Sequence, residues 1–252
     1  MAKIALITGA TSGIGEACAH LFAREHYNLV LTGRRLDRLE KLAKKLNTKY
    51  NVEIAVSTFD VRDREQVVSN LEGLPAKWKK VNVLINNAGL SQGLDPINNG
   101  SFDDWDTMID TNVKGLLYVS KVVSNWMIEH KTGHIINIGS IAGKEVYPNG
   151  NVYCASKYAV DALNKGMRID LLPHGIRVTA VHPGAVETEF SEVRFKGDKE
   201  RAKKVYDGFE PLVAEDIAET IWFAVSRPAH VNINELVVMP TAQATATNIL
   251  RK

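Results

Sequence analysis

A chain of 252 residues with 45% hydrophobic and 24% charged residues has an ordinary globular composition and is long enough to bury a large apolar core. Its formal net charge of +2 comes from 31 basic and 29 acidic residues that are scattered along the chain, which argues against nucleic-acid or membrane-surface binding. The absence of a leader or membrane-length apolar run predicts a cytoplasmic protein, and the spacing of its Cys and His residues predicts no metal site.

The first predicted strand, residues 3–8, runs through a glycine-rich turn into a helix over residues 13–27. A strand, glycine turn and helix in this order present backbone N–H groups and the positive end of the helix to a phosphate. The glycines depart from the Gly-x-Gly-x-x-Gly spacing, and a tight turn without a ligand is the alternative. We expect a dinucleotide site whose candidate residues here are Gly9, Thr11, Ser12, Gly13, Ile14 and Gly15.

A second predicted strand, residues 28–32, ends in Gly33, Arg34 and Arg35. In NAD-binding proteins an acidic residue about 20 residues past the glycines holds the ribose hydroxyls. This chain has two arginines there, and arginine can bind a 2′-phosphate, so NADP is favoured over NAD. The alternative is that both arginines are only the solvated start of a helix over residues 36–46.

Polar or small residues follow three further predicted strands, residues 52–59, 81–85 and 134–138. Asp60 and Val61 follow the first of them, where the acid could accept a hydrogen bond from the adenine amine. The amides and glycine of residues 86–89 follow the second and suit the floor of a crevice. Ser140 follows the third, and a long helix over residues 102–126 carries Asn112.

Tyr153 and Lys157 lie four residues apart in a predicted helix that continues to about residue 172. They therefore share one face of the helix. A free tyrosine titrates near pH ~10, and a neighbouring ammonium is expected to lower its pKa. With the Ser140 hydroxyl upstream, the pair predicts proton transfer to a carbonyl or from an alcohol.

The remaining chain continues the alternation of strands and helices, with strands over residues 176–181 and 235–239 and a helix over 214–225. Residues 187–210 are predicted to be a mobile insert, and residues 241–252 a small polar tail. The whole chain is predicted to form a single α/β domain, doubly wound and Rossmann-type, with about seven parallel strands and helices on both faces.

Together these motifs resemble the short-chain dehydrogenase/reductases. The resemblance covers nearly the whole chain and rests on Thr8-Gly-x-x-x-Gly-x-Gly15, Asn86-Asn-Ala-Gly89, Asn112, Ser140, Tyr153-x-x-x-Lys157 and Pro183-Gly184. Three further segments resemble the NADP-dependent 3-hydroxy acid dehydrogenases: Gly33-Arg-Arg35, Ser191-Glu-Val-Arg-Phe-Lys-Gly-Asp198 and Pro228-Ala-His-Val-Asn-Ile-Asn234. Glu187 departs from the pattern, because it places an acid where the loop should meet the nicotinamide and the phosphate.

The resemblance implies a role for each matching residue. Tyr153 would be the acid/base, Lys157 would lower its pKa and hold the nicotinamide ribose, and Ser140 would hydrogen-bond the substrate oxygen. Asn112 would support a water-filled proton path, although a buried amide that only satisfies backbone groups is the alternative. The implied cofactor-binding set also includes Asn87, Ala88, Gly89, Pro183, Gly184, Val186 and Thr188, and the implied assembly is a homotetramer.

The expected substrate is a small 3-hydroxy acid, such as serine, allo-threonine or 3-hydroxypropionate, or its 3-oxo form. Its carboxylate needs a cation, and Arg194 in the insert is the candidate, because arginine offers a bidentate fork. Lys144 is the alternative cation, and Tyr147 could line the pocket. The competing functions are reduction of carrier-bound 3-oxoacyl groups or other ketones, and a nucleotide-sensing regulator without turnover.

Overall fold

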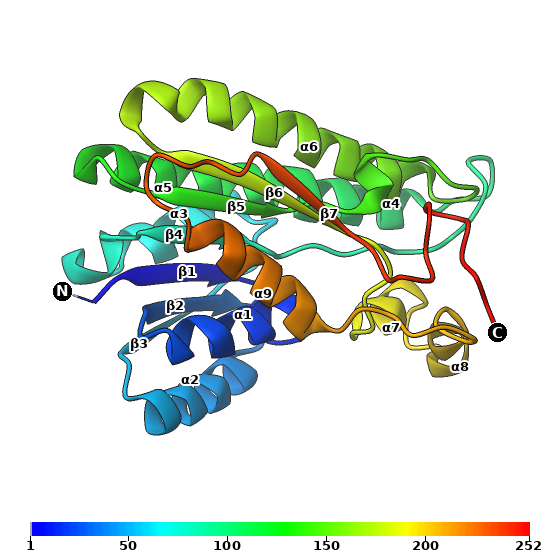
Figure 1. Ribbon diagram of the computed structural model, residues 1–252, viewed down its shortest axis with the longest axis horizontal. Helices are drawn as coiled ribbons and strands as arrows, with labels where there is room; N and C mark the ends of the chain where they lie inside the picture. The colour runs from blue at the N-terminus through cyan, green and yellow to red at the C-terminus, as the bar shows by residue number, and fades with distance from the viewer. Residues whose placement is uncertain (1) are drawn as a thin grey trace.

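The computed structural model describes residues 2–252, in which seven strands form one parallel sheet in the order β3-β2-β1-β4-β5-β6-β7 (Figure 1). The short apolar runs of the sequence become its buried central strands, and the seven-stranded doubly wound α/β fold is confirmed. The strands are β1 (Ile4–Thr8), β2 (Asn28–Gly33), β3 (Ile54–Thr58), β4 (Val83–Asn86), β5 (His134–Ile138), β6 (Arg177–Pro183) and β7 (Glu235–Val238).

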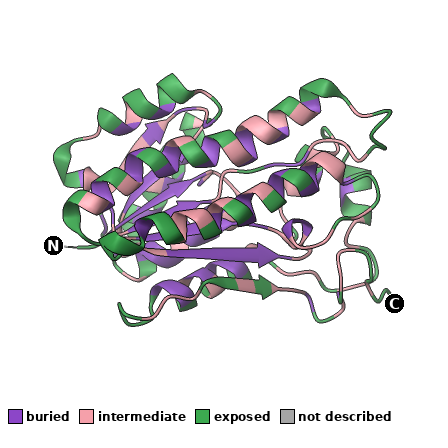
Figure 2. Ribbon diagram, turned by 90° about the horizontal axis from the view of Figure 1, so that it is seen from above, coloured by how far each residue is buried: buried purple, intermediate pink, exposed green. Residues whose placement is uncertain are grey.

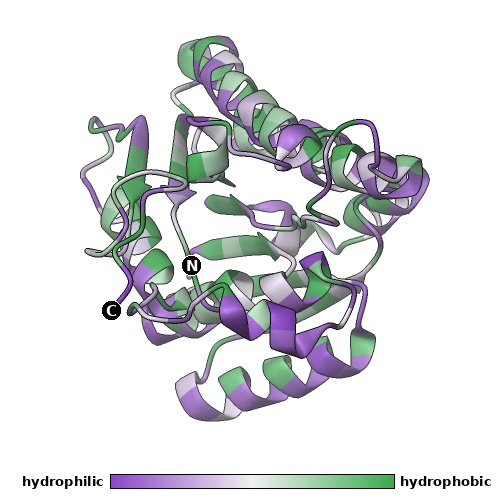
Figure 3. Ribbon diagram, turned by 90° about the vertical axis from the view of Figure 1, so that its right-hand side faces the viewer, coloured by the Kyte–Doolittle hydropathy of each residue, from purple (hydrophilic) through white to green (hydrophobic). Residues whose placement is uncertain are grey.

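Helices cover both faces of the sheet (Figures 1 and 2). Helices α1, α2 and α9 bury their apolar side chains against one face, and α3, α5 and α6 bury theirs against the other. The view along the layers shows the sheet between its two helix layers (Figure 3). The helices are α1 (Gly13–Arg24), α2 (Leu36–Tyr50), α3 (Arg64–Glu72), α4 (Phe102–Ile109), α5 (Leu116–His130), α6 (Asn151–Leu171), α7 (Phe190–Arg194), α8 (Lys199–Lys204) and α9 (Ala214–Val225).

The chain reverses its direction of winding between β1 and β4, which are hydrogen-bonded neighbours although β2 and β3 separate them in sequence. A crevice opens at such a switch point, outside the carboxyl ends of the strands. Figure 1 shows α7 and α8 at that end of the sheet. The topology therefore gathers the residues that follow β1, β2, β4, β5 and β6 around one place.

Two segments differ from the expectation. The predicted helix over residues 102–126 is interrupted by a π-helical turn, Asp110–Gly115, between α4 and α5. A π turn adds a residue per turn and is frequent at functional sites; here it contains Asn112. The polar insert contains α7 and α8, whose packing residues Ser191 and Ala202 are buried. Both differences depend on tertiary contacts that local periodicity does not encode.

Among residues 2–252, none of the helices combines the length and the apolar character that spanning a bilayer requires.

Candidate active site

A cleft of about 450 Å³ opens at the carboxyl end of the sheet, at the β1/β4 switch point. Its size suits a small-molecule or cofactor site. Asn112 and Gly15 lie outside its lining. The cleft brings together the other residues that the sequence predicted, which are Gly9, Thr11, Ser12, Gly13, Ile14, Arg34, Arg35, Asp60, Val61, Asn87, Ala88, Gly89, Ser140, Tyr153, Lys157, Pro183, Gly184, Val186, Thr188 and Arg194.

The glycine turn between β1 and α1 has the form of a phosphate cradle. Gly9 has φ +66°, a conformation that side chains with a Cβ rarely adopt. A Cβ on Gly15 would lie 2.3 Å from the Gly9 carbonyl oxygen, so the turn can close only with glycine there. Ser12 precedes α1 without a side-chain cap, which leaves the first N–H groups of the helix for an anion. The cradle therefore fits the pyrophosphate of a dinucleotide.

Arg34 and Arg35 flank the far end of the same cleft. The Arg35 guanidinium donates to Thr11 Oγ1 at 2.7 Å and to Ser12 Oγ at 3.0 Å, which ties it to the glycine turn. Arg34 lies 3.9 Å from the Asp60 carboxylate, which also forms a 2.6 Å ion pair with Arg62. These contacts place two guanidinium groups beside the cradle, where they fit a 2′-phosphate.

Tyr153 is the central side chain of the inner cleft. It lies in the first turn of α6, is 7% exposed and lines the cleft together with Ser140. Burial raises the pKa of its phenol well above the ordinary value, and Arg194 and Ser140 offset this only in part. The expected lowering of this pKa by Lys157 is not found here, because desolvation dominates. A protonated phenol at neutral pH is a proton donor.

Lys157 lies behind Tyr153, with its Nζ 6.0 Å from the centre of the phenol ring. Its ammonium donates to the Ile138 carbonyl oxygen at 2.9 Å. Burial lowers the pKa of Lys157 to about 8, so a large fraction is charged at neutral pH in a desolvated position. This arrangement costs stability and is typical of a functional lysine.

We expect Lys157→Met to be more stable than the parent protein at pH 7, by about 1–2 kcal/mol, because a buried charge is removed. The parent's folded pKa lies below its unfolded value, so its stability rises between about pH 8 and pH 10.5 as both states lose the proton. The difference in unfolding free energy between Lys157→Met and the parent should therefore shrink across that range. Denaturant unfolding at both ends of the range measures it, and an advantage independent of pH would contradict the assignment of the shifted pKa to Lys157.

Asn112 lies behind the cleft and connects the end of β4 with α6. Its Oδ1 accepts from the Leu90 N–H at 2.8 Å, and its Nδ2 donates to the Leu90 carbonyl at 2.8 Å and to Ser156 Oγ at 3.0 Å. A Cβ added to Gly89 would lie 3.3 Å from Asn112 Oδ1 and 3.6 Å from Lys157 Nζ. The amide thus satisfies buried backbone groups directly beside the lysine.

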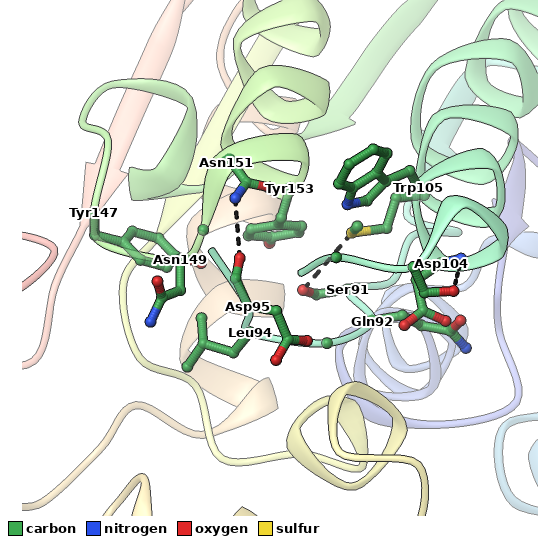
Figure 4. A pocket seen from close by; sticks show the side chains of 15 residues that line it. Ser91, Gln92, Leu94, Asp95, Asp104, Trp105, Tyr147, Asn149, Asn151 and Tyr153 are labelled. Atoms are coloured by element: carbon green, nitrogen blue, oxygen red, sulfur yellow. Dashed lines mark hydrogen bonds between the residues drawn. The ribbon is translucent and has the colours of Figure 1, made fainter. Parts of the chain in front are cut away.

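Arg194 lies over the Tyr153 ring, with 5.2 Å between Cζ and the ring centre. Its Nε donates to Ser91 Oγ at 3.1 Å and its Nη2 to Tyr147 Oη at 3.0 Å. Figure 4 shows Ser91, Tyr147 and Tyr153 around the small pocket that adjoins the cleft on this side. A cation is therefore held beside the phenol.

The other candidate cation, Lys144, has its ammonium on two carboxylates. It lies 2.9 Å from Asp161 and 2.7 Å from Glu235, and it is absent from the cleft lining. His182 lies beside the same carboxylates, and with them it could form a metal site. Lys144 pairs with both acids and Lys165 pairs with Asp161 at 2.7 Å, so both carboxylates already have cationic partners.

Several lining residues were missed by the sequence reasoning. Ser91 positions Arg194, Phe190 packs 5.7 Å from Tyr153 between ring centres, and Gln243 accepts from the Ala185 N–H with its side-chain oxygen. Ile249, in the tail that follows the last strand, also lines the cleft. Glu187, the departure from the family pattern, is exposed and outside the lining. Ser91, Phe190, Gln243 and Ile249 carry no local motif, and only the fold brings them to the cleft or to the small pocket beside it.

Comparison with known proteins agrees with this geometry. Residues 3–199 match the family model described as short chain dehydrogenase. The protein belongs to this family. The family resemblance stated from the sequence is thus confirmed, and the shared fold explains why the Ser140, Tyr153 and Lys157 side chains of this short-chain dehydrogenase meet at one cleft.

Individual relatives of this short-chain dehydrogenase align over almost its whole length. An NADP-dependent 3-hydroxy acid dehydrogenase of Salmonella typhi is 46% identical, over 96% of this chain and 97% of the relative. Sulfoacetaldehyde reductase 2 of Chromohalobacter salexigens is 47% identical, over 97% and 96%. A solved structure, the closed form of serine dehydrogenase complexed with NADP+, superposes with a TM-score of 0.91 at 43% identity and covers 99% of this chain and 100% of its own.

Proposed function

We propose that this enzyme interconverts a small 3-hydroxy acid and its 3-oxo form with NADP, and that Tyr153 is the acid/base. The observation that carries the proposal is the position of Arg194 over the Tyr153 ring. A cation beside the proton donor binds the carboxylate of a substrate whose carbonyl faces the phenol. The names of the relatives, an NADP-dependent 3-hydroxy acid dehydrogenase and a serine dehydrogenase with NADP+, support both the cofactor and the reaction class.

NADP supplies or accepts the hydride when it is bound. Gly9, Gly13 and the first turn of α1 would hold its pyrophosphate, and Arg34 and Arg35 would hold its 2′-phosphate. The segments that start at Asn87 and Pro183 line the same cleft with Ala88, Gly89, Gly184, Val186 and Thr188, and would contact the nicotinamide half.

In the direction of reduction, the Tyr153 hydroxyl donates its proton to the carbonyl oxygen of the substrate. Ser140 hydrogen-bonds the same oxygen and stabilises the charge that develops on it. The Lys157 ammonium, 6.0 Å from the centre of the phenol ring, is the cation that would offset the negative charge left on Tyr153 after this step, although burial keeps the net pKa of the phenol high. In the direction of oxidation the same groups remove the proton of the alcohol.

A relative whose name refers to a sulfonated aldehyde favours a second candidate substrate. Sulfoacetaldehyde reductase 2 is as similar to this chain as the hydroxy acid dehydrogenases are. A sulfonate is also an oxyanion that an arginine fork can bind, so an aldehyde with a sulfonate group would use the same Arg194 site. Carrier-bound 3-oxoacyl groups would need a basic patch beside the cleft, and the sequence has no pronounced one.

A substrate panel tests the proposed chemistry. We expect turnover of L-serine, L-allo-threonine or 3-hydroxypropionate with NADP, followed by NADPH absorbance, to exceed that of a neutral secondary alcohol. Sulfoacetaldehyde with NADPH belongs in the same panel. Equal kcat/KM for the acids and the neutral alcohol would contradict the carboxylate site.

We expect Arg194→Met to raise the KM for the preferred acid about 10- to 100-fold, because charge-assisted hydrogen bonds contribute about 1.5–3 kcal/mol. The KM for the neutral alcohol should change little. Arg201→Met is the matched control, since Arg201 lies on α8, where it stacks on Phe195 at 4.3 Å and is exposed. A variant that lost activity equally on the acid and the alcohol would show that Arg194 acts on the fold or on Tyr153 and not on the carboxylate.

The homotetramer is also part of the proposal. Large apolar side chains are exposed on the two long helices of one face, with Ile169 on α6 at 71% and Leu117 on α5 at 38%. Association of these helices across subunits would bury that surface.

A further inference from the structure

Glu189 connects the substrate side of the cleft with its adenine side. It immediately precedes α7, and its carboxylate accepts hydrogen bonds from Arg35 at 3.2 Å and from Arg38 at 2.8 Å. Both arginines lie at the start of α2, across the cleft from α7. One carboxylate therefore joins two elements that are far apart in the sequence.

The start of α2 has the features of an anion site. Arg35 is the residue that precedes the helix, and no side chain caps the first N–H groups. The positive end of the helix and the guanidiniums of Arg35 and Arg38 attract negative charge to the same place. In this structure the anion that they hold is the carboxylate of Glu189.

The segment that follows Glu189 contacts the chemistry of the inner cleft. Phe190 packs against Tyr153 with 5.7 Å between ring centres, and Arg194 at the end of α7 lies over the same ring. A displacement of Glu189 would therefore move a short helix that packs against Tyr153 and carries the candidate carboxylate ligand, Arg194.

We propose that the Glu189 carboxylate competes with the 2′-phosphate of NADP for Arg35 and Arg38, and so lowers the affinity for the cofactor. Because Glu189 immediately precedes α7, the same competition links cofactor binding to the substrate side of the cleft. The inference rests on the proposed function, which assigns the 2′-phosphate to the arginines at this place. It adds Arg38 to that site. A dianionic phosphate displaces the single carboxylate from the guanidiniums, and α7 then loses its link to α2.

The solvent exposure of the three side chains limits how much free energy this competition involves. The side chains of Arg35, Arg38 and Glu189 are 39%, 44% and 46% exposed, so the ion pairs are partly screened by water. Partial burial favours the neutral acid, but hydrogen bonds from Arg38 and Arg35 outweigh it and keep the pKa of Glu189 below its ordinary value. The acid is therefore ionised at neutral pH, and its removal changes affinity by a small factor.

The test compares two nucleotides that differ only in the presence of the 2′-phosphate. Adenosine 2′,5′-bisphosphate and adenosine 5′-monophosphate are titrated calorimetrically into the parent, Glu189→Gln and Glu192→Gln. Glu192 lies on α7, is exposed and forms no ion pair among the described residues 2–252, so it controls for the change of charge. We expect Glu189→Gln to bind the bisphosphate about two- to fivefold more tightly and the monophosphate unchanged, with no gain for Glu192→Gln.

Hydrogen exchange tests the link to α7. We expect the amides of α7 to exchange faster in Glu189→Gln than in the parent without nucleotide, and the bisphosphate to accelerate them only in the parent. Unchanged or weaker binding of the bisphosphate by Glu189→Gln would overturn the inference while leaving the arginine site intact. If the parent itself bound both nucleotides equally, the proposed 2′-phosphate site would fail, and this inference with it.

Discussion

Tyr153→Phe is expected to lower kcat by about 10³-fold or more, because a positioned general acid/base typically contributes about 10²- to 10⁴-fold and no neighbouring group can replace it. The Ser140 hydroxyl accepts a hydrogen bond from the Ala142 N–H, Tyr147 is held by Arg194, and Lys157 donates to the Ile138 carbonyl. The variant should fold normally, since phenylalanine keeps the ring that packs against Phe190. Its Kd for NADP should stay within about threefold of the parent value, a difference of less than 1 kcal/mol.

The measurement is kcat in both directions together with calorimetric NADP binding. Tyr118→Phe is the matched control, because Tyr118 on α5 packs against the hydrophobic core outside the cleft lining. It should retain nearly full activity. Substantial turnover by Tyr153→Phe would remove the proposed acid/base and with it the proposed mechanism.

Replacing both Arg34 and Arg35 by alanine should weaken NADP about 100-fold or more, while NAD changes by a small factor. Each arginine offers charge-assisted hydrogen bonds to a 2′-phosphate that contribute about 1.5–3 kcal/mol, and NAD has no group in that place. The ratio of the two dissociation constants, measured by calorimetry, is therefore the informative quantity.

Arg24→Ala controls for the loss of positive charge. Arg24 lies in the last turn of α1, is exposed and pairs only with Glu25, remote from the cleft lining. It should leave both constants unchanged. An unaltered preference in the double variant would show that neither guanidinium recognises the phosphate, and that the two arginines are only the solvated start of α2.

The order of the elements could be predicted from sequence because each depends on local patterns. The continuous apolar runs over β1, β4 and β5 identify buried parallel strands. Gly9 and Gly15 mark a turn that only glycine can form, and the four-residue spacing of Tyr153 and Lys157 places both on one face of α6. Each of these conclusions follows from covalent geometry and short-range sterics.

The interruption of the predicted long helix could not be predicted from local sequence patterns. The Asn112 side chain in the π turn donates to Leu90, in the segment that follows β4, and to Ser156 on α6. Neither partner is near Asn112 in the chain. A helix-compatible sequence does not reveal where such long-range bonds outweigh regular helix geometry.

The electrostatics of the site also depended on the folded structure. From the sequence, a nearby lysine should lower the pKa of Tyr153; in the folded protein, burial raises it instead, because desolvation of the phenol exceeds the available attraction. The choice of Arg194 over Lys144 likewise depended on partners from distant segments, since Asp161 and Glu235 hold the Lys144 ammonium.

The sequence by itself determined the class of fold, the position of the phosphate cradle and the motif residues of the cleft, because motifs of a few residues encode turns, helix faces and strand ends. Only the tertiary structure decided which cation lies over Tyr153, how strongly its phenol holds a proton and that Glu189 reaches the arginines of α2. These properties depend on burial and on contacts between segments that are far apart in the chain, and no local pattern records either of them.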